Sequence, residues 1–345
     1  MKGREKEMQL TYEQISSVTL GAVSLEQTDG GIRFHRFSKA EEDQYIPRAG
    51  LHVKLFAPAG IRLEFETDAT ALDMSVNALT ATSRSYFRVD ILKNDEILGG
   101  IQNFPEEMKN GEYPAGKYPL GVYSGSFSLG EGRKKVTVQL PWSVPCAVEK
   151  LELADATYIK PLPREKKALL YGDSITQGYD TLCPSQSYAV RLCDRLGMEG
   201  INKAIGGERY CPDLAAVPCG FQPDLILGAY GVNDWHQMLQ PEFEDRCCRF
   251  WQALCSQYPN TKKFALTPIW FKPTREVAFG PYAEFDTIEK TICKVMKEFP
   301  EVTVLRGWDF VPHDPEYFGD GRLHPNDKGF DAYYQNLLKA LEPYM

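Results

Sequence analysis

A serine and a histidine in the second half of the chain could together do nucleophilic chemistry. Ser174 lies in the stretch LLYGDSITQGYD, directly after an apolar run that ends at Gly172. His324 lies in GDGRLHPNDKG, a polar and glycine-rich stretch near the end of the chain. A serine hydroxyl becomes a nucleophile when a neighbouring base accepts its proton, and imidazole is a common base. The pair therefore predicts attack by Ser174 on a carbonyl carbon, with His324 as the general base.

Attack on a carbonyl creates an oxyanion, which needs hydrogen-bond donors. The stretch NKAIGGERY places Gly206 and Gly207 after an apolar run, where a backbone without Cβ can approach a ligand closely. The stretch GAYGVNDW places Asn233 after Gly231 and offers a side-chain amide. Each stretch taken singly is better explained as a turn, because glycine and asparagine are common turn residues.

These residues must be positioned by a sheet whose strands alternate with helices. After about residue 165, the predicted strands are KALLY, GINKAIG, DLILGAYG, KFALTPI and VTVLRG. Apolar residues at helical spacing predict helices near residues 188–196, 243–258, 285–299 and 330–341. This alternation predicts a parallel sheet covered on both faces, with ligands bound at the carboxyl edge of its strands. Ser174 would stand at that edge.

The first part of the chain has a different period. From about residue 20 to 155, apolar and polar residues alternate in several short runs separated by turn material, which predicts an antiparallel sandwich without a long helix. The apolar members of these runs are Leu51, Val53 and Leu55; Ile61, Leu63 and Phe65; Leu72, Met74 and Val76; Phe87, Val89 and Ile91; and Val136, Val138 and Leu140. The stretch KPLPREKK suits a linker, so we expect a β-sandwich domain over residues 1–160 and a second domain over residues 165–345.

The composition of the chain argues against some classes of binding partner. The 345-residue chain has a formal net charge of -8 and no long run of lysine or arginine, which argues against binding to nucleic acid or to an anionic membrane. No apolar stretch is long enough to span a bilayer and residues 1–23 lack a signal-peptide core, so we expect a cytoplasmic protein. The nine cysteines include no C-x-x-C pair, which favours free thiols over disulfides or a zinc site.

Taken together and in this order, four stretches of residues 165–345 resemble the sequence blocks of the SGNH, or GDSL-type, hydrolase superfamily. The blocks are Gly172 to Ser174, Asn202 to Gly207, Gly231 to Asp234, and Asp320 to Pro325. The resemblance implies a three-layer, flavodoxin-like α/β hydrolase domain that needs no metal or other cofactor. It implies that Ser174 is the nucleophile and His324 the base. It also implies an oxyanion hole made by the backbone amides of Ser174 and Gly207 and the side chain of Asn233.

The last block departs from the family pattern. SGNH hydrolases usually have Asp-x-x-His, whereas Arg322 is an extra residue here and Gly321 stands where the aspartate would be. We expect Asp320 to orient His324 if the loop bulges. Asp309, Asp314, a water molecule and a backbone carbonyl are the alternatives.

The sandwich resembles, more loosely, the jelly-roll domain that precedes the hydrolase domain in some bacterial GDSL-type esterases, including acetyl-sugar esterases. We therefore expect a serine esterase that acts on a small short-chain acyl ester, plausibly an acetylated carbohydrate. The alternatives are a lysophospholipase or thioesterase of the same superfamily and a carbohydrate-binding protein without catalysis. Aromatic residues that follow the catalytic strands could contact the substrate, although packing explains each equally well; they are Tyr179, Trp235, Trp270 and Phe271.

Overall fold

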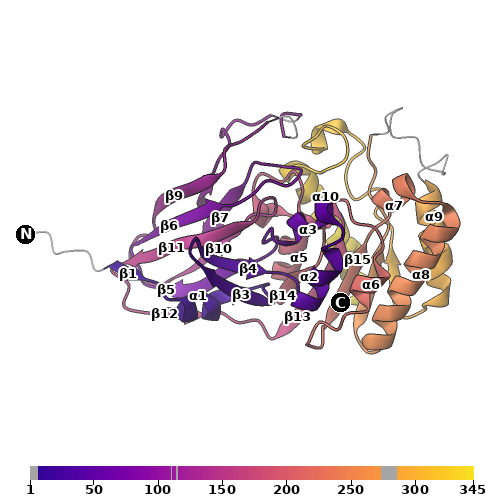
Figure 1. The fold of residues 1–345 in the computed structure, drawn as a ribbon, viewed down its shortest axis with the longest axis horizontal. Helices are drawn as coiled ribbons and strands as arrows, with labels where there is room; N and C mark the ends of the chain where they lie inside the picture. The colour runs from indigo at the N-terminus through magenta and orange to yellow at the C-terminus, as the bar shows by residue number, and fades with distance from the viewer. Residues whose placement is uncertain (1–6, 110, 114–115, 273–285) are drawn as a thin grey trace, which may run out of the picture.

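The computed structural model describes residues 7–109, 111–113, 116–272 and 286–345, which form a β-rich part and an α/β part side by side (Figure 1). None of the helices in these residues combines the length and the apolarity needed to cross a bilayer. All nine cysteines are free thiols, as the sequence predicts.

Two antiparallel sheets make up the β-rich part. The first has the order β3-β4-β11-β6-β9, with β1 also paired to β11, and the second has the order β12-β5-β10-β7-β8, with β2 also paired to β5. The strands of the first sheet are β1 (Glu7–Gln9), β3 (Ser24–Thr28), β4 (Gly31–His35), β6 (Ala71–Ala78), β9 (Gly121–Ser128) and β11 (Cys146–Ala154). Those of the second are β2 (Thr19–Leu20), β5 (Arg62–Thr67), β7 (Arg88–Lys93), β8 (Glu96–Gln102), β10 (Lys134–Gln139) and β12 (Ile159–Pro161).

One apolar core joins the two sheets. Every second residue of β6 is buried, and Leu72 and Val76 pack in the same cluster as Leu63 of β5 and Val138 of β10. Side chains of a strand alternate between its faces, so this pattern is that of two sheets packed face to face. The predicted sandwich is confirmed.

The prediction of a strand over residues 51–55 is wrong. These residues lie in α3 (Ala49–Leu55), which follows α1 (Tyr12–Val18) and α2 (Lys39–Tyr45), each seven residues long. A run of five residues fits both periods, because Leu51 and Leu55 are four positions apart and share one face of a helix. Tertiary packing therefore decides whether such a run forms a strand or a helix. Here Leu51 and Leu55 pack against the core of the α/β part.

The second part is built around one parallel sheet with the order β14-β13-β15-β16-β17. Its strands are β13 (Lys166–Gly172), β14 (Met198–Asn202), β15 (Leu225–Ala229), β16 (Lys262–Leu266) and β17 (Val302–Leu305). Its helices are α4 (Ser174–Gln177), α5 (Tyr188–Leu196), α6 (Pro212–Ala215), α7 (Val232–Gln237), α8 (Gln240–Gln257), α9 (Asp286–Val295) and α10 (Asp327–Leu341). In chain order the strands read 2-1-3-4-5, which is the flavodoxin-like arrangement.

Helices cover both faces of this sheet. Leu169 and Tyr171 of β13 pack in one core with α6, α8 and α9, whereas Ala168 and Leu170 pack in a second core with α5 and α10. The three-layer prediction is thereby confirmed, and so are its five strands. The four predicted helices are present as well, although Phe285 lies outside the described residues.

The chain passes from one part to the other between β12 and β13. Both ends of the stretch predicted as a linker belong to strands, because Pro161 pairs with Phe65 in β5 and Lys166 pairs with Met198 in β14. Only residues 162–165 connect the two sheets.

Candidate active site

Ser174 stands at the carboxyl end of β13, between the two strands that flank it. The strand ends at Gly172, and Asp173 caps the short helix α4 by accepting a hydrogen bond from the amide of Ile175 at 3.0 Å. A Cβ at Gly172 would lie 2.3 Å from Oγ1 of Thr176, so only glycine allows α4 to turn back this tightly over the strand. The turn places Ser174 where the strand order reverses, which is the usual ligand position in open α/β sheets.

His324 and Asp320 complete a continuous chain of hydrogen bonds with Ser174. The Nε2 atom of His324 lies 2.8 Å from Oγ of Ser174, and its Nδ1 atom lies 2.7 Å from Oδ2 of Asp320. The order hydroxyl, imidazole, carboxylate is that of a serine hydrolase triad. Asn326 holds the histidine loop to α10, because its side chain accepts a hydrogen bond from the amide of Gly329 at 3.0 Å.

The extra residue in the last block is absorbed by a loop that wraps around Asp320. Oδ1 of Asp320 accepts hydrogen bonds from the amides of Arg322 at 2.9 Å, Leu323 at 2.7 Å and His324 at 3.2 Å. Burial opposes ionisation of this carboxyl, but the His324 side chain and the loop amides outweigh it and hold the pKa of Asp320 well below its usual range. Asp320 is therefore an anion wherever imidazole chemistry operates.

The two alternative orienters have other contacts. Asp309 lies 3.2 Å from Nε2 of His313, and Asp314 accepts a hydrogen bond from the amide of Glu316 at 3.0 Å. Within the described residues, neither forms a hydrogen bond or an ion pair with His324. The geometry thus favours Asp320 over both.

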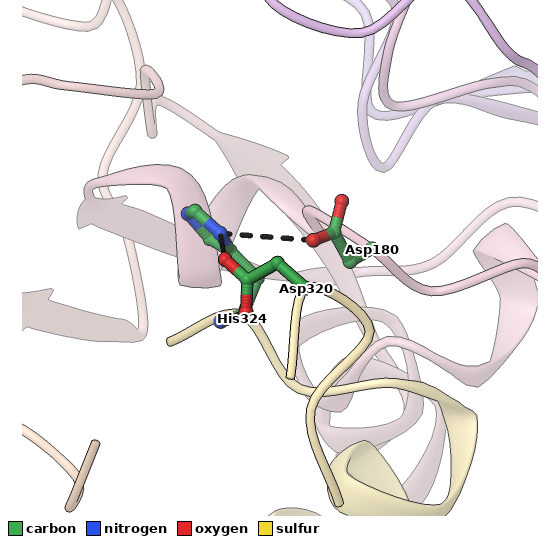
Figure 2. Close-up of side chains that lie close together, drawn as sticks. All are labelled: Asp180, Asp320 and His324. Atoms are coloured by element: carbon green, nitrogen blue, oxygen red, sulfur yellow. Dashed lines mark hydrogen bonds and ion pairs between the residues drawn. The ribbon is translucent and has the colours of Figure 1, made fainter. Parts of the chain in front are cut away.

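A second carboxylate, which the sequence did not indicate, also approaches Nδ1 of His324. Figure 2 shows Asp180 and Asp320 directed at the same ring nitrogen, with Oδ2 of Asp180 at 3.7 Å. Asp180 is fully buried, and Arg84 neutralises it through two bonds of 2.7 and 3.0 Å. The hydroxyl of Tyr86 donates a third bond to Asp180 at 2.6 Å. Arg84 and Tyr86 belong to the β-rich part, so both parts of the chain build the surroundings of the histidine.

Asp180, Asp320 and His324 are also close enough together to be considered as metal ligands, with donor atoms within 4.8 Å of one another. Their donor atoms are already engaged, since Asp320 bonds His324 and both oxygens of Asp180 bond Arg84. A guanidinium 3.5 Å from Nδ1 occupies the position a cation would need. The donor set fits a charge-balanced hydrogen-bond network better than a metal site.

Gly207 lies in the loop after β14, and Asn233 lies in the first turn of α7, after β15. The amides of residues 203–206 and 208 all donate hydrogen bonds to protein acceptors, whereas the Gly207 amide has no acceptor among the described residues. The backbone of Gly207 has φ +88, a conformation that favours glycine. The side-chain nitrogen of Asn233 donates to the carbonyl of Glu208 at 3.0 Å, which leaves its second hydrogen available. The arrangement supplies the donor types an oxyanion hole requires.

Charged residues of the β-rich part form hydrogen bonds and ion pairs with the loop that carries Gly207. Arg36 is fully buried and donates to the carbonyls of Asn202 and Ala204 at 2.7 and 2.8 Å. Arg48 makes two bonds to Glu208, at 2.7 and 2.8 Å. The third contact is a buried ion pair, in which Nζ of Lys203 lies 2.6 Å from Oε2 of Glu41. These contacts bridge the two parts of the chain and would hold the Gly207 amide in place.

The four aromatic residues predicted to contact substrate are mostly covered. Tyr179, Trp235 and Phe271 are 2%, 5% and 3% exposed, and Trp270 stacks on His313 with ring centroids 5.3 Å apart. Of the four, Tyr179 lies beside the triad, with its ring centroid 5.4 Å from that of His324. Contact of any of them with substrate stays a prediction, as do the catalytic roles of the triad and of the oxyanion donors.

Several known proteins have the same architecture over nearly the whole length of this chain. A salicylyl-acyltransferase from a tetracycline biosynthetic pathway has a TM-score of 0.76 and 17% identity, over 99% of this chain and 98% of that one. A family two carbohydrate esterase from Cellvibrio japonicus has a TM-score of 0.63 and 14% identity, over 98% of each chain. An acetyl xylan esterase from the rumen bacterium Butyrivibrio proteoclasticus has a TM-score of 0.59 and 13% identity, over 98% of each. No curated protein sequence matches the chain.

At the level of sequence families, the GDSL-like Lipase/Acylhydrolase family matches residues 170–332. That span runs from the last residues of β13 into α10 and contains all four sequence blocks. The chain therefore carries a GDSL-like lipase/acylhydrolase domain joined to an N-terminal β-sandwich, and this domain indicates an ester-hydrolysing enzyme.

Proposed function

We propose that the protein is a serine esterase that removes a short acyl group, acetyl, from a carbohydrate through an acyl-enzyme. The observation that carries the proposal is the unbroken line from Asp320 through His324 to Ser174, with both hydrogen bonds under 3 Å. His324 would take the proton from Ser174 as its oxygen attacks the ester carbonyl. The resulting imidazolium would be stabilised by the carboxylate of Asp320.

The rest of the cycle uses the same groups. The amides of Ser174 and Gly207 and the side chain of Asn233 would stabilise the oxyanion. His324 would return its proton to the departing alcohol, which leaves an acyl ester on Ser174. A water molecule, deprotonated by His324, would then release the acid and restore the hydroxyl.

The choice of substrate is supported by two solved structures of the same architecture, a carbohydrate esterase and an acetyl xylan esterase. A lysophospholipase or thioesterase would need a long apolar groove for its acyl chain. We also propose that the protein acts in the cytoplasm, which fractionation of the source cells tests.

Hydrolysis of p-nitrophenyl acetate tests the proposal. The wild-type protein should release p-nitrophenol, and Ser174→Ala should reduce the rate to about that of the buffer while circular dichroism remains unchanged. Equal rates in the two proteins would instead favour a carbohydrate-binding protein without catalysis. A series of acyl esters of rising chain length, assayed beside acetylated sugars, separates an acetyl esterase from a lipase or thioesterase.

A further inference from the structure

Lys54 carries a positive charge to the edge of the proposed oxyanion hole. It lies in α3 of the β-rich part, and its ammonium donates to the carbonyl of Gly206 at 2.6 Å. A Cβ built on Gly207 would lie 3.5 Å from Nζ of Lys54, so the ammonium faces the residue whose amide we assign to the oxyanion. A charged group on a substrate held there would come within reach of Lys54.

Lys54 has no ion-pair partner of its own in the part of the chain that the structure describes, and the nearby carboxylate of Glu208 is already bound by Arg48. Other charged residues that contact this loop form ion pairs, Glu41 with Lys203 and Arg48 with Glu208. Lys54, in contrast, forms no ion pair within the described residues. An ammonium has three donors, and the bond to Gly206 uses one of them. Lys54 is only partly buried, so its remaining donors can reach solvent or a bound ligand.

The surroundings of Lys54 disfavour its positive charge. Burial and the nearby Arg84 guanidinium lower the pKa of Lys54 and outweigh the opposite effect of Glu208, so the surroundings disfavour the charged form. The chain as a whole has a net charge of -8, so an uncompensated cation here is a local feature rather than a reflection of composition. An anion bound beside Lys54 would stabilise its protonated, charged form.

We propose that the natural ester carries a carboxylate that forms an ion pair with Lys54, so that the enzyme prefers anionic to neutral esters. This inference rests on the proposed esterase function and names its substrate class. The carboxylate could belong to the acyl group, as in a monoester of a dicarboxylic acid, or to the alcohol, as in the acetyl ester of a hydroxy acid or an acidic sugar. The chemistry recognised is the same in both.

Two pairs of nearly isosteric esters separate these sources. Monoethyl succinate and ethyl levulinate differ in the charge of the acyl group, and acetoxyacetate and acetoxyacetone differ in the charge of the alcohol. For each pair, acid release in a pH-stat gives the ratio of kcat/KM for the anionic ester to that for the neutral ester. The ratio cancels differences that affect both esters equally.

Lys54→Met should lower this ratio roughly tenfold to a hundredfold for one of the pairs, because it removes a charge-assisted hydrogen bond to the substrate. Lys54→Arg should keep most of the preference. Lys39→Met is the matched control, since Lys39 lies on α2 and is paired with Asp43 on the exposed surface. In the wild type the ratio should also fall severalfold between about 50 mM and about 500 mM salt, a measurement that does not depend on any variant folding.

Three results would overturn the inference. If the wild type hydrolyses the neutral esters through Ser174 but Lys54→Met leaves both ratios unchanged, the substrate class is wrong and the esterase function stands. If Arg322→Met rather than Lys54→Met lowers the ratio, the anion is bound by the catalytic loop, where Arg322 also forms no ion pair within the described residues. If none of the four esters is hydrolysed, the proposed function fails and the inference fails with it.

Discussion

Arg84 and Asp180 form a two-point ion pair that joins the two parts of the chain beside the Nδ1 atom of His324. Nη2 of Arg84 lies 3.5 Å and Oδ2 of Asp180 lies 3.7 Å from that atom. Asp180 is fully buried and Arg84 is 11% exposed, so solvent screens the pair weakly. The β-sandwich thus supplies the charge that balances the second carboxylate at the histidine.

Arg84→Met should move the acid limb of the pH profile of kcat/KM to higher pH. The variant leaves the Asp180 carboxylate uncompensated and also removes a cation beside the imidazole. Both changes favour the protonated imidazole, which cannot act as a base, so higher pH is needed for activity. The displacement is measured with p-nitrophenyl acetate from about pH 5 to about pH 9.

The double variant Arg84→Met/Asp180→Asn is the control for charge. It removes the cation and the carboxylate together, so its acid limb should return close to that of the wild type. A profile that stays displaced in the double variant would show that Arg84 acts through packing against Tyr179 rather than through charge.

Asp320→Asn should lower kcat by roughly a thousandfold to ten-thousandfold with little effect on KM. The amide oxygen can still accept the three loop hydrogen bonds that Oδ1 of Asp320 accepts, so the loop should keep its shape. The amide nitrogen would face Nδ1 of His324 and favour the wrong tautomer. Steady-state kinetics with a thermal melt measures both effects, and a kcat within about threefold of the wild type would assign the orienting role to Asp180.

Local patterns in the sequence were sufficient for the parts of the site that follow strands. Ser174 and Asn233 could be placed because the apolar runs before them end at turn residues on one edge of a parallel sheet. Asp320 could be named but not assigned with certainty. The bulge around it depends on three amide hydrogen bonds that no spacing rule anticipates.

The contributions of the β-sandwich were beyond local patterns. Arg84 acts on a residue 96 positions away in the chain, and Lys54 on one 152 positions away. Periodicity reports only which face of an element is apolar, and it placed Lys54 on a strand that is in fact the helix α3. The packing of α3 against the loop of Gly207 orients Lys54, and that packing is a property of the whole fold.

Asn233→Ala should lower kcat on the order of a hundredfold, because it removes one donor to the oxyanion. KM should change little, since the donor acts mainly in the transition state. The same variant loses the bond from Asn233 to the carbonyl of Glu208, so the loop needs a separate check. Arg48→Met provides it, because that variant loosens the same loop at Glu208 without touching the donor. Equal losses in the two variants would point to the loop rather than to the amide.

Asp234→Asn should make the stability of the protein less dependent on pH. Burial raises the pKa of Asp234 to about 7, and its Oδ2 atom has no hydrogen-bond partner within the described residues. Between the pKa of an unfolded aspartate, about 4, and this value, the folded state keeps a proton that the unfolded state has lost. Stability therefore falls as pH rises through this window, by up to about 1.4 kcal/mol for each pH unit.

Asparagine cannot lose a proton, and its oxygen can still accept the bond from the amide of Tyr210 that Asp234 accepts at 3.0 Å. The variant should thus match the wild type near pH 4 and exceed its stability at about pH 8, in urea unfolding curves at the two pH values. Some dependence on pH should remain, because burial also raises the pKa of Asp173 to about 6. Asp213→Asn, at an exposed position, is the matched control and should leave the curves unchanged. If Asp234→Asn behaves like that control, the Asp234 carboxyl is ionised in the folded protein at neutral pH and has a partner that compensates its charge.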